Sequence, residues 1–333
     1  MRAMVLSAQA AVETSPLSAS DQPMPEPGPG EARVRVRACG ACRTDIHVIE
    51  GDLPARRLPL VPGHQVVGKV DALGPGATRF RAGDRVGIAW LRSTCGRCRF
   101  CLGGSENLCA QSTYAGWTHD GGYAEYACVP EAFAYAIPPV FGDAEVTPLL
   151  CAGIIGYRAL RRSQVPKGGR LGLYGFGSSA HVTLQVARHW GCTVYVATRE
   201  PARQRLALEL GAAWAGAAGD PLPDKLDGAI VFAPVGALVP IALRDLDKGG
   251  TVALAGIHMT DLPAMAYEPH LFWDKTLRSV TANTRADGEA LLAEAAAIPI
   301  RPRVTRYRLE DANRALADIT SSEVEATAVL MLD

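Results

Sequence analysis

The chain has 333 residues, of which 48% are hydrophobic, and its 34 basic residues balance its 34 acidic residues. A chain of this length is expected to form about two domains and to bury roughly 75% of its unfolded surface. Because there is no net charge to attract polyanions, we expect neither a nucleic acid nor a membrane surface as a partner. No apolar run approaches the roughly 20 residues that a spanning helix needs, and the N-terminal residues lack a signal-like segment, so we expect a cytoplasmic protein.

Two patterns divide the chain. Up to about residue 140, short alternating runs such as residues 32–37 (ARVRVR) are separated by turn-rich segments, which predicts a β-rich domain. From about residue 170 onward, apolar strands alternate with helical patterns, which predicts a parallel, doubly wound sheet. We therefore expect an α/β plus β fold, with a β-rich domain over residues 1–142, a doubly wound domain over 143–284 and a return to the first domain over 285–333. Helices are expected over about residues 200–210, 238–246 and 287–297, and a closing strand over 328–332.

Four cysteines cluster in the segment CGRCRFCLGGSENLC, and they are Cys95, Cys98, Cys101 and Cys109. A four-thiolate zinc site needs four sulfurs about 2.3 Å from the ion, and short C-x2-C steps let one turn supply two of them. The chain has nine cysteines. In a cytosolic protein, as expected here, a cluster of cysteines favours metal binding over disulfides. Because all four ligands would come from the protein, we expect a structural zinc. Buried free thiols are one alternative, and a nucleic-acid-binding zinc ribbon, disfavoured by the few flanking arginines, is another.

A second, dispersed set of candidate ligands consists of Cys42, His64 and Cys151. A catalytic zinc has three protein ligands and one open position. Each of these residues is a weak signal alone, but Asp45 could accept the second imidazole N–H of His64 and so fix its tautomer. Thr44 and His47 lie close by in sequence and suit a proton path. Cys39 and Cys42 also form a C-x2-C pair, whose redox interpretation is an alternative that the absent βαβ context disfavours.

A glycine pattern lies between a predicted strand and a predicted helix. Gly175, Gly177 and Ala180, in GFGSSA, follow the strand-like segment RLGLYGF and match the dinucleotide-binding pattern G-x-G-x-x-G/A. The amides at the start of the helix, near Ser178 and Ser179, are placed to hold the cofactor phosphates.

The residues at the end of the next predicted strand, VYVATR, bear on whether NAD or NADP binds. NAD sites usually place an acidic residue about 20 residues after the glycines, where it holds the ribose hydroxyls. This chain has Thr198 and Arg199 there, with Arg203 a turn later. No carboxylate at the strand end would repel a 2′-phosphate, and guanidinium groups could pair with one, so we expect NADP to be accepted. The alternative is NAD binding through Thr198 and the backbone, with both arginines in solvent.

Together these segments resemble the zinc-containing medium-chain alcohol dehydrogenases, in particular the bacterial propanol-preferring branch. The resemblance covers nearly the whole chain and rests on CRTDIH, PGHQVVG, the four-cysteine segment, GGYAEY, LLCAG and LYGFG. It implies a GroES-like β-barrel catalytic domain followed by a Rossmann domain. It also implies two zinc ions per chain, a catalytic one on Cys42, His64 and Cys151 and a structural one on the four clustered cysteines.

The resemblance assigns further roles. Thr44 matches the hydroxyl that takes the alcohol proton, and His47 matches the group that passes it to solvent. Trp90 matches a bulky residue that lines the substrate pocket. Gln65 stands where many members of the family have Glu, so any assistance of that Glu in ligand exchange at zinc is in doubt here.

The expected activity is reversible hydride transfer between NAD or NADP and a primary or small secondary alcohol, with an aldehyde or ketone as the other reactant. Zinc, as a Lewis acid, would lower the pKa of the alcohol hydroxyl. A reductase of bulkier aldehydes or polyols is the nearest alternative. A non-catalytic sensor of zinc and nucleotide is a further one, which the retention of Thr44 and His47 disfavours. An apolar edge strand over residues 277–282 predicts a dimer or tetramer.

Overall fold

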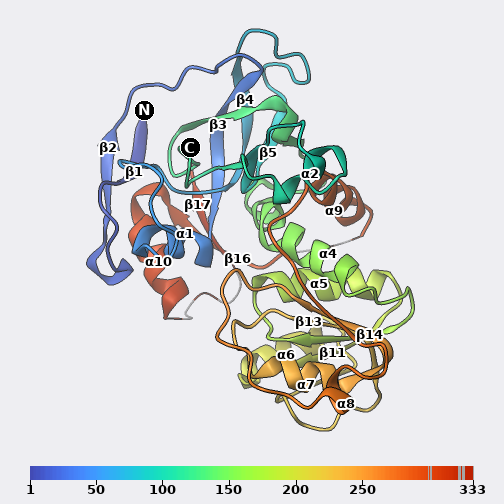
Figure 1. The fold of residues 1–333 in the computed structure, drawn as a ribbon. Coiled ribbons are helices and arrows are strands. Elements are labelled where there is room, and N and C mark those ends of the chain that lie inside the picture. The colour runs from blue at the N-terminus through green and yellow to red at the C-terminus, as the bar shows by residue number, and fades with distance from the viewer. Residues whose placement is uncertain (299, 301, 322–323, 325–326, 333) are drawn as a thin grey trace. The chain divides into compact units, whose positions relative to one another are not determined.

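The computed structural model describes residues 1–298, 300, 302–321, 324 and 327–332. Their contacts divide the chain into two compact units, drawn as a ribbon in Figure 1. The first unit comprises Met1–Cys151, Ala282–Ala296 and Arg301–Asp333, and the second comprises Ala152–Thr281 and Ala297–Ile300. The functional domain assignment made from the sequence stays a prediction. Each described helix is too short or too polar to cross a membrane.

The first unit is built on a mostly antiparallel seven-stranded sheet. Its central strand is β3 (Glu31–Ala41), in which valines alternate with arginines, so that Val34 and Val36 are buried while Arg35 and Arg37 face solvent. The strand predicted over residues 32–37 is therefore confirmed, with extensions at both ends. The order is β16 (Val304–Arg308), β17 (Thr327–Met331), β3, β4 (Gln65–Leu73), β5 (Arg85–Ile88) and β9 (Ala134–Ala136), with β8 (Tyr126–Pro130) also paired to β3.

Smaller elements complete this unit. Two short sheets pair β1 (Arg2–Leu6) with β2 (Leu17–Asp21) and β6 (Leu91–Ser93) with β7 (Thr113–Tyr114). The helices are α1 (Arg43–Glu50), α2 (Arg99–Leu102), α3 (Asp143–Val146), α9 (Arg285–Ala297) and α10 (Ala312–Thr320). Short 3-10 turns cover Val12–Thr14, Glu106–Leu108, Glu131–Phe133, Thr147–Leu150 and Leu309–Asp311. Buried apolar residues from one face of the sheet form a core with those of α1 and α10, and Ala38 and Val329 form a separate cluster with Ala144 of α3.

The second unit is a parallel six-stranded sheet with helical connections, as the alternating pattern predicts. The strand order is β12 (Trp214–Gly216), β11 (Thr193–Ala197), β10 (Arg170–Tyr174), β13 (Leu226–Val231), β14 (Leu246–Leu254) and β15 (Thr276–Ser279). The chain runs outward from β10 through β12 and then returns to β13 on the other side of β10. Ligands of such sheets bind where the order reverses, at the carboxyl ends of the strands. The turn after β10 lies at this point.

The helices of the second unit are α4 (Ala152–Arg162), α5 (Ser178–His189), α6 (Pro201–Glu209), α7 (Leu238–Asp245) and α8 (Tyr267–His270). The predicted helices over about 200–210, 238–246 and 287–297 are confirmed as α6, α7 and α9, and the closing strand as β17, with boundaries shifted by one or two residues. The apolar edge strand predicted over 277–282 is β15, which ends earlier, at Ser279.

Candidate metal and cofactor sites

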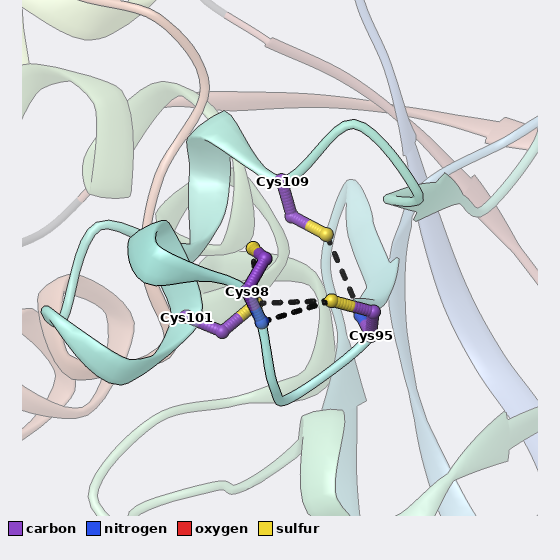
Figure 2. Close-up of side chains that lie close together, drawn as sticks. All are labelled: Cys95, Cys98, Cys101 and Cys109. Atoms are coloured by element: carbon purple, nitrogen blue, oxygen red, sulfur yellow. Dashed lines mark hydrogen bonds between the residues drawn. The ribbon is translucent and has the colours of Figure 1, made fainter.

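The four clustered cysteines point their sulfurs toward one another, as Figure 2 shows. All four sulfurs lie within 4.8 Å of each other. The Sγ atom of Cys101 is 3.9 Å from that of Cys95 and 3.5 Å from that of Cys98. Four sulfurs placed tetrahedrally 2.3 Å from one ion are about 3.8 Å apart. The segment 95–109, which we call the four-cysteine lobe, therefore has the dimensions of a closed tetrahedral metal site.

Backbone amides of the four-cysteine lobe donate hydrogen bonds to its sulfurs, which favours metal binding. The Cys98 N–H donates to the Cys95 sulfur and the Cys95 N–H donates to the Cys109 sulfur, each over 3.4 Å. Amide hydrogen bonds from Arg97 and Cys98 lower the pKa of the Cys95 thiol to about 6. Gly96, with a φ of +69°, permits the tight turn that brings these amides to the sulfur. Amides directed at the sulfurs favour the thiolate, which is the form that binds metal.

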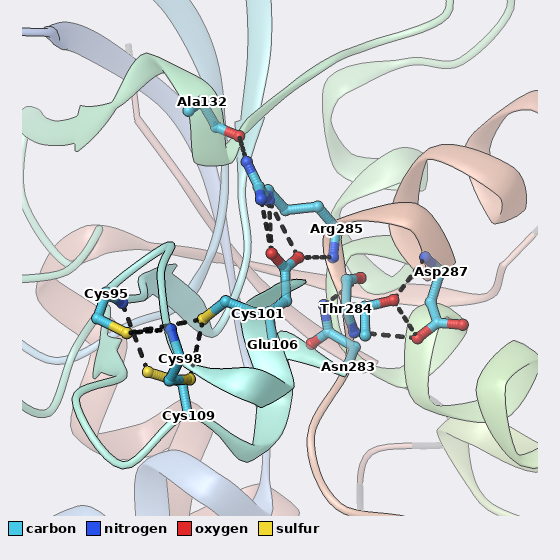
Figure 3. A network of polar contacts seen from close by, with 10 residues as sticks. All are labelled: Cys95, Cys98, Cys101, Glu106, Cys109, Ala132, Asn283, Thr284, Arg285 and Asp287. Carbon is cyan, nitrogen blue, oxygen red and sulfur yellow. Dashed lines mark hydrogen bonds and ion pairs between the residues drawn. The ribbon is translucent and has the colours of Figure 1, made fainter. Parts of the chain in front are cut away.

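The lobe is connected to α9 by a partly exposed ion pair, shown in Figure 3. The carboxylate of Glu106 accepts hydrogen bonds from the Arg285 guanidinium, at 2.6 and 3.0 Å, and from its backbone N–H, at 2.8 Å. The guanidinium also lies over the Phe133 ring, 4.4 Å from its centroid. Thr284 and Asp287 exchange hydrogen bonds in the first turn of α9. The start of this helix is thus fixed to the lobe that carries the four sulfurs.

Three elements bring the second ligand set together. Cys42 is the N-cap of α1, His64 directly precedes β4, and Cys151 directly precedes α4. Their ligand atoms lie within 4.8 Å of one another. The Nε2 atom of His64 is 3.5 Å from the sulfur of Cys42 and 3.3 Å from that of Cys151. We call this group the three-ligand site.

Asp45 links two parts of the three-ligand site. One carboxylate oxygen lies 3.0 Å from Nδ1 of His64, and both side chains are only 1% exposed. The other oxygen accepts the backbone N–H of Cys42, over 2.9 Å, and so caps α1. An Nδ1–H donated to Asp45 leaves Nε2 directed at the two sulfurs. Burial lowers the pKa of His64, but the charges of Asp45 and Cys42 outweigh it and raise the pKa to about 10. Because metals bind the thiolate and the neutral imidazole, metal binding at the three-ligand site releases protons.

Gly63, Gln65 and Tyr123 are buried neighbours of the three-ligand site, and of these only Tyr123 was not considered individually from the sequence. Gly63 has a φ of +98°, and a Cβ at this position would lie 2.4 Å from the Tyr123 ring, so only glycine fits before His64. Tyr123 is fully buried, and burial together with the charge of Asp45 raises its pKa well above the usual value. The GGYAEY segment that contains Tyr123 was the available signal. Gln65 is also fully buried, and neither of its amide atoms has a hydrogen-bond partner among the described residues.

Thr44 and His47 lie one turn apart on α1, and both are half-buried. The Nδ1 atom of His47 is 2.7 Å from a carboxylate oxygen of Asp52, a partner that the sequence did not reveal. The Trp90 ring stands edge-on to the His64 ring, with 5.0 Å between the centroids. The structure thus brings Trp90 directly to a candidate ligand.

The structure does not support the alternative interpretation of Cys39 and Cys42 as a redox pair. Both residues are free cysteines, and Cys39 is fully buried in β3. Burial, reinforced by the charge of Asp45, raises the pKa of the Cys39 thiol well above its usual value. A thiol of this kind is a poor nucleophile, so Cys39 serves as a packed core residue.

The predicted dinucleotide turn joins β10 to α5. Gly175 has a φ of +93°, and a Cβ there would lie 2.8 Å from the backbone nitrogen of Ala233, so the turn requires glycine. Gly177 is the N-cap of α5, and a Cβ there would meet no protein atom within 4 Å. Its lack of a side chain therefore leaves open space in front of the first helical amides, at Ser178 and Ser179. Ala180 is fully buried.

The candidate cofactor-selecting residues lie between β11 and α6. Thr198 is buried, and its backbone N–H donates to Gly216 over 2.8 Å. Arg199 is exposed. Arg203 forms an ion pair with Glu200 over 2.5 Å, so its guanidinium is already engaged. The two arginines, which were expected to act alike, are therefore not equivalent.

Comparisons with known proteins agree with this arrangement. Residues 28–139 match the model of the alcohol dehydrogenase GroES-like domain, and residues 180–297 match that of the zinc-binding dehydrogenases. The chain is 55% identical, over 89% of its length and 87% of the relative, to "Probable alcohol dehydrogenase AdhA" of Mycobacterium tuberculosis. It is 36% identical, over 89% of each chain, to an alcohol dehydrogenase of Geobacillus stearothermophilus. A cobalt- and zinc-bound thermostable alcohol dehydrogenase from Pyrobaculum aerophilum superimposes with a TM-score of 0.88 at 26% identity, covering 100% of this chain and 99% of that one.

A GroES-like domain and a Rossmann-like domain define the class, which is that of the medium-chain dehydrogenases. The chain belongs to the zinc-containing medium-chain alcohol dehydrogenase family. It is an NAD(P)-dependent alcohol dehydrogenase that acts on a small-molecule substrate. The fold, the family and the alcohol dehydrogenase activity predicted from the sequence are thereby confirmed, and the substrate range stays a prediction.

Proposed function

We propose that the chain interconverts primary or small secondary alcohols with aldehydes or ketones, and that it holds two zinc ions of unequal roles. The observation that carries this proposal is the three-ligand site, where two sulfurs and an imidazole nitrogen lie within 4.8 Å of one another. Three protein ligands leave one tetrahedral position for a substrate, whereas the four-cysteine lobe leaves none. We therefore assign the catalytic zinc to Cys42, His64 and Cys151, and the structural zinc to the lobe.

The donor sets fit zinc on their chemistry. Thiolate and imidazole ligands favour zinc over magnesium or calcium, which prefer oxygen. The carboxylate of Asp45 behind His64 is the kind of partner that orients metal-binding imidazoles. Zinc at the three-ligand site would supply Lewis acidity that lowers the pKa of an alcohol hydroxyl, and a nicotinamide ring would accept the hydride.

We assign the proton path to α1. The Thr44 hydroxyl accepts the alcohol proton and donates its own onward, and His47 passes the proton to solvent. Both residues are half-buried on the helix that begins at the ligand Cys42, so the path starts beside the three-ligand site. Asp52, whose carboxylate is 2.7 Å from Nδ1, holds the His47 ring in place. Loss of one proton and one hydride converts the alcohol into its carbonyl product.

For the cofactor, we propose that the turn from Gly175 to Ala180 and the α5 amides hold the pyrophosphate, and that NADP is accepted as well as NAD. The exposed Arg199 follows β11, where a 2′-phosphate would lie, and a guanidinium can form charge-assisted hydrogen bonds with it. Arg203 contributes less, because Glu200 holds it.

We further propose a homo-oligomer, a dimer or tetramer, that assembles through β15. This strand is an edge of the six-stranded sheet, where unpaired backbone groups can extend a sheet into a second copy. Phe272 and Trp273, shortly before β15, are 51% and 45% exposed. Sedimentation of the purified protein at micromolar concentration tests this proposal. The cytoplasmic location stays a prediction.

Steady-state rates with ethanol, 1-propanol and benzyl alcohol, each with NAD and with NADP, test the proposed function. We expect turnover of all three alcohols and measurable use of both cofactors. Metal-replete protein that oxidises none of them would contradict the proposed substrate class.

A further inference from the structure

A cavity of about 440 Å³ lies in the first unit, outside both metal sites. Its lining comes from residues 22–26 after β2, the segment that ends at Val61 before β4, Arg92 of β6, the turn over residues 119–121 and the first residues of β8. None of the described residues that line it belongs to the three-ligand site, the four-cysteine lobe or the proposed proton path. A volume of this size suits a small molecule.

The apolar part of the lining is formed by residues that the fold already buries. Each is at most 6% exposed, and they are Val5, Leu60, Val61, Ala124 and Ala127. A hydrocarbon group that contacts these side chains is removed from water, which favours binding. The lining therefore suits a ligand with an apolar body.

Arg92 brings a nearly buried guanidinium group to the same cavity. Its side chain is 10% exposed, and Glu31 pairs with its Nη2 atom. The Nε atom is buried, and no group among the described residues accepts a hydrogen bond from it. A buried N–H without an acceptor is costly, so an acceptor bound against Arg92 would stabilise this group.

Two further basic side chains line the cavity. Arg57 is about half exposed, and its Nη2 atom lies 3.3 Å from a carboxylate oxygen of Asp120. Burial, reinforced by the charges of Arg92 and Arg57, lowers the pKa of His119, although the charges of Glu31 and Asp120 oppose this shift. His119 therefore lies in a positive potential, which a bound anion would reduce.

We infer that this cavity, which we call the arginine cavity, binds a small monocarboxylate with an apolar body, whose carboxylate accepts the Arg92 Nε–H and lies near Arg57 and His119. Hydrogen bonds between guanidinium and carboxylate groups are charge-assisted and therefore strong. Glu31 and Asp120 already pair with the two guanidinium groups, so they would repel a phosphate dianion more than a single negative charge. The arginine cavity is thus a binding site separate from the reaction.

Octanoate is the probe, and octanamide is its neutral counterpart of nearly the same shape. Titration calorimetry of the zinc-loaded wild type should show one octanoate per chain, bound about ten- to a hundredfold more tightly than octanamide. Arg92→Gln should remove most of this difference. Arg85→Gln is the matched control, because Arg85 belongs to the same unit and pairs with Asp143 over 2.6 Å outside the arginine cavity. It should leave the affinity for octanoate unchanged.

Two other variants test the site if Arg92→Gln does not fold. The double variant Arg57→Gln and His119→Gln, at two side chains that are not fully buried, should weaken octanoate binding about two- to tenfold. Cys151→Ala, which alters the three-ligand site, should bind octanoate as tightly as the wild type.

The inference would be overturned by equal affinities of the wild type for the two probes, or by the absence of saturable octanoate binding below about 1 mM. A folded Arg92→Gln variant that keeps the full preference for octanoate would overturn it too. Loss of octanoate binding in Cys151→Ala would place the carboxylate at the metal instead of in the arginine cavity. Each of these results would leave the proposed function standing, because none concerns the turnover of alcohols.

Discussion

At the scale of single residues, Asp45 connects helix capping to the orientation of a metal ligand. One of its oxygens faces Nδ1 of His64 and the other accepts the Cys42 backbone N–H. Asp45→Asn removes the charge, and the affinity of the three-ligand site for zinc should fall about ten- to a hundredfold. Competition with a chelator measures this affinity. Asp52→Asn, which changes the partner of His47 instead, should leave the affinity unchanged. An unaltered affinity in Asp45→Asn would show that the carboxylate does not support the ligand.

The two residues of the proton path differ in what can replace them. Thr44 contacts the alcohol proton first in our assignment, and no solvent molecule can take its position. His47 is half-buried at the outer end of the path, where water can substitute for it. We expect His47→Gln to lower kcat about ten- to a hundredfold near neutral pH, and Thr44→Ala to lower it more with little change in the KM for the cofactor. Equal small losses from both substitutions would mean that the proton leaves by another route.

The two arginines after β11 provide an internal comparison for cofactor choice. Arg199 is exposed, whereas Arg203 is paired with Glu200 over 2.5 Å. Arg199→Ala should weaken NADP about ten- to a hundredfold and NAD hardly at all, whereas Arg203→Ala should affect both little. Thr198→Asp should shift the preference toward NAD. The measurement is the dissociation constant of each cofactor. A wild type that uses NAD at least a hundredfold better than NADP would show that Arg199 is only a surface charge.

At the scale of elements, the Glu106–Arg285 pair ties the four-cysteine lobe to α9. Burial raises the pKa of Glu106, but the hydrogen bonds and charge of Arg285 outweigh it and hold the pKa below its usual value. Because the folded pKa is depressed, the pair stabilises the fold above the unfolded pKa of about 4.5 and ceases to do so as the pH falls through the folded pKa.

Glu106→Gln should therefore lower the free energy of unfolding at pH 7 by about 1–2 kcal/mol, a value reduced by solvent screening because the Arg285 side chain is 39% exposed. The difference from the wild type should shrink as the pH is lowered below the unfolded pKa of about 4.5. Denaturant unfolding at several pH values measures both effects. Glu289→Gln, which breaks the exposed pair with Arg79, should cost less than about 0.5 kcal/mol. A pH-independent difference would show that charge pairing is not its cause.

Several helices and strands could be predicted from the sequence, whereas the contacts between distant residues could not. Hydrophobic period and turn residues located β3, α6, α7 and β17 within a few residues, because these signals are local. The short spacing of the four cysteines likewise made their convergence predictable. The partners of Glu106 and Trp90 were not predictable, because Arg285 is 179 residues away from Glu106 and nothing in the local pattern indicates which rings stack. Glu200, whose pairing makes Arg203 unlike Arg199, was overlooked although it directly follows Arg199.

At the scale of the whole molecule, the proposed function depends on two metal sites with different roles in one chain. Their donor sets predict different consequences of ligand loss, because a structural zinc contributes to folding and a catalytic zinc to chemistry. Zinc content per chain, measured together with 1-propanol turnover and thermal unfolding, tests this directly. We expect two zinc ions per chain in the wild type. Cys151→Ala should retain about one zinc ion per chain and show no turnover, and Cys98→Ala should unfold at a lower temperature. A fully active wild type that contains a single zinc per chain would contradict this expectation.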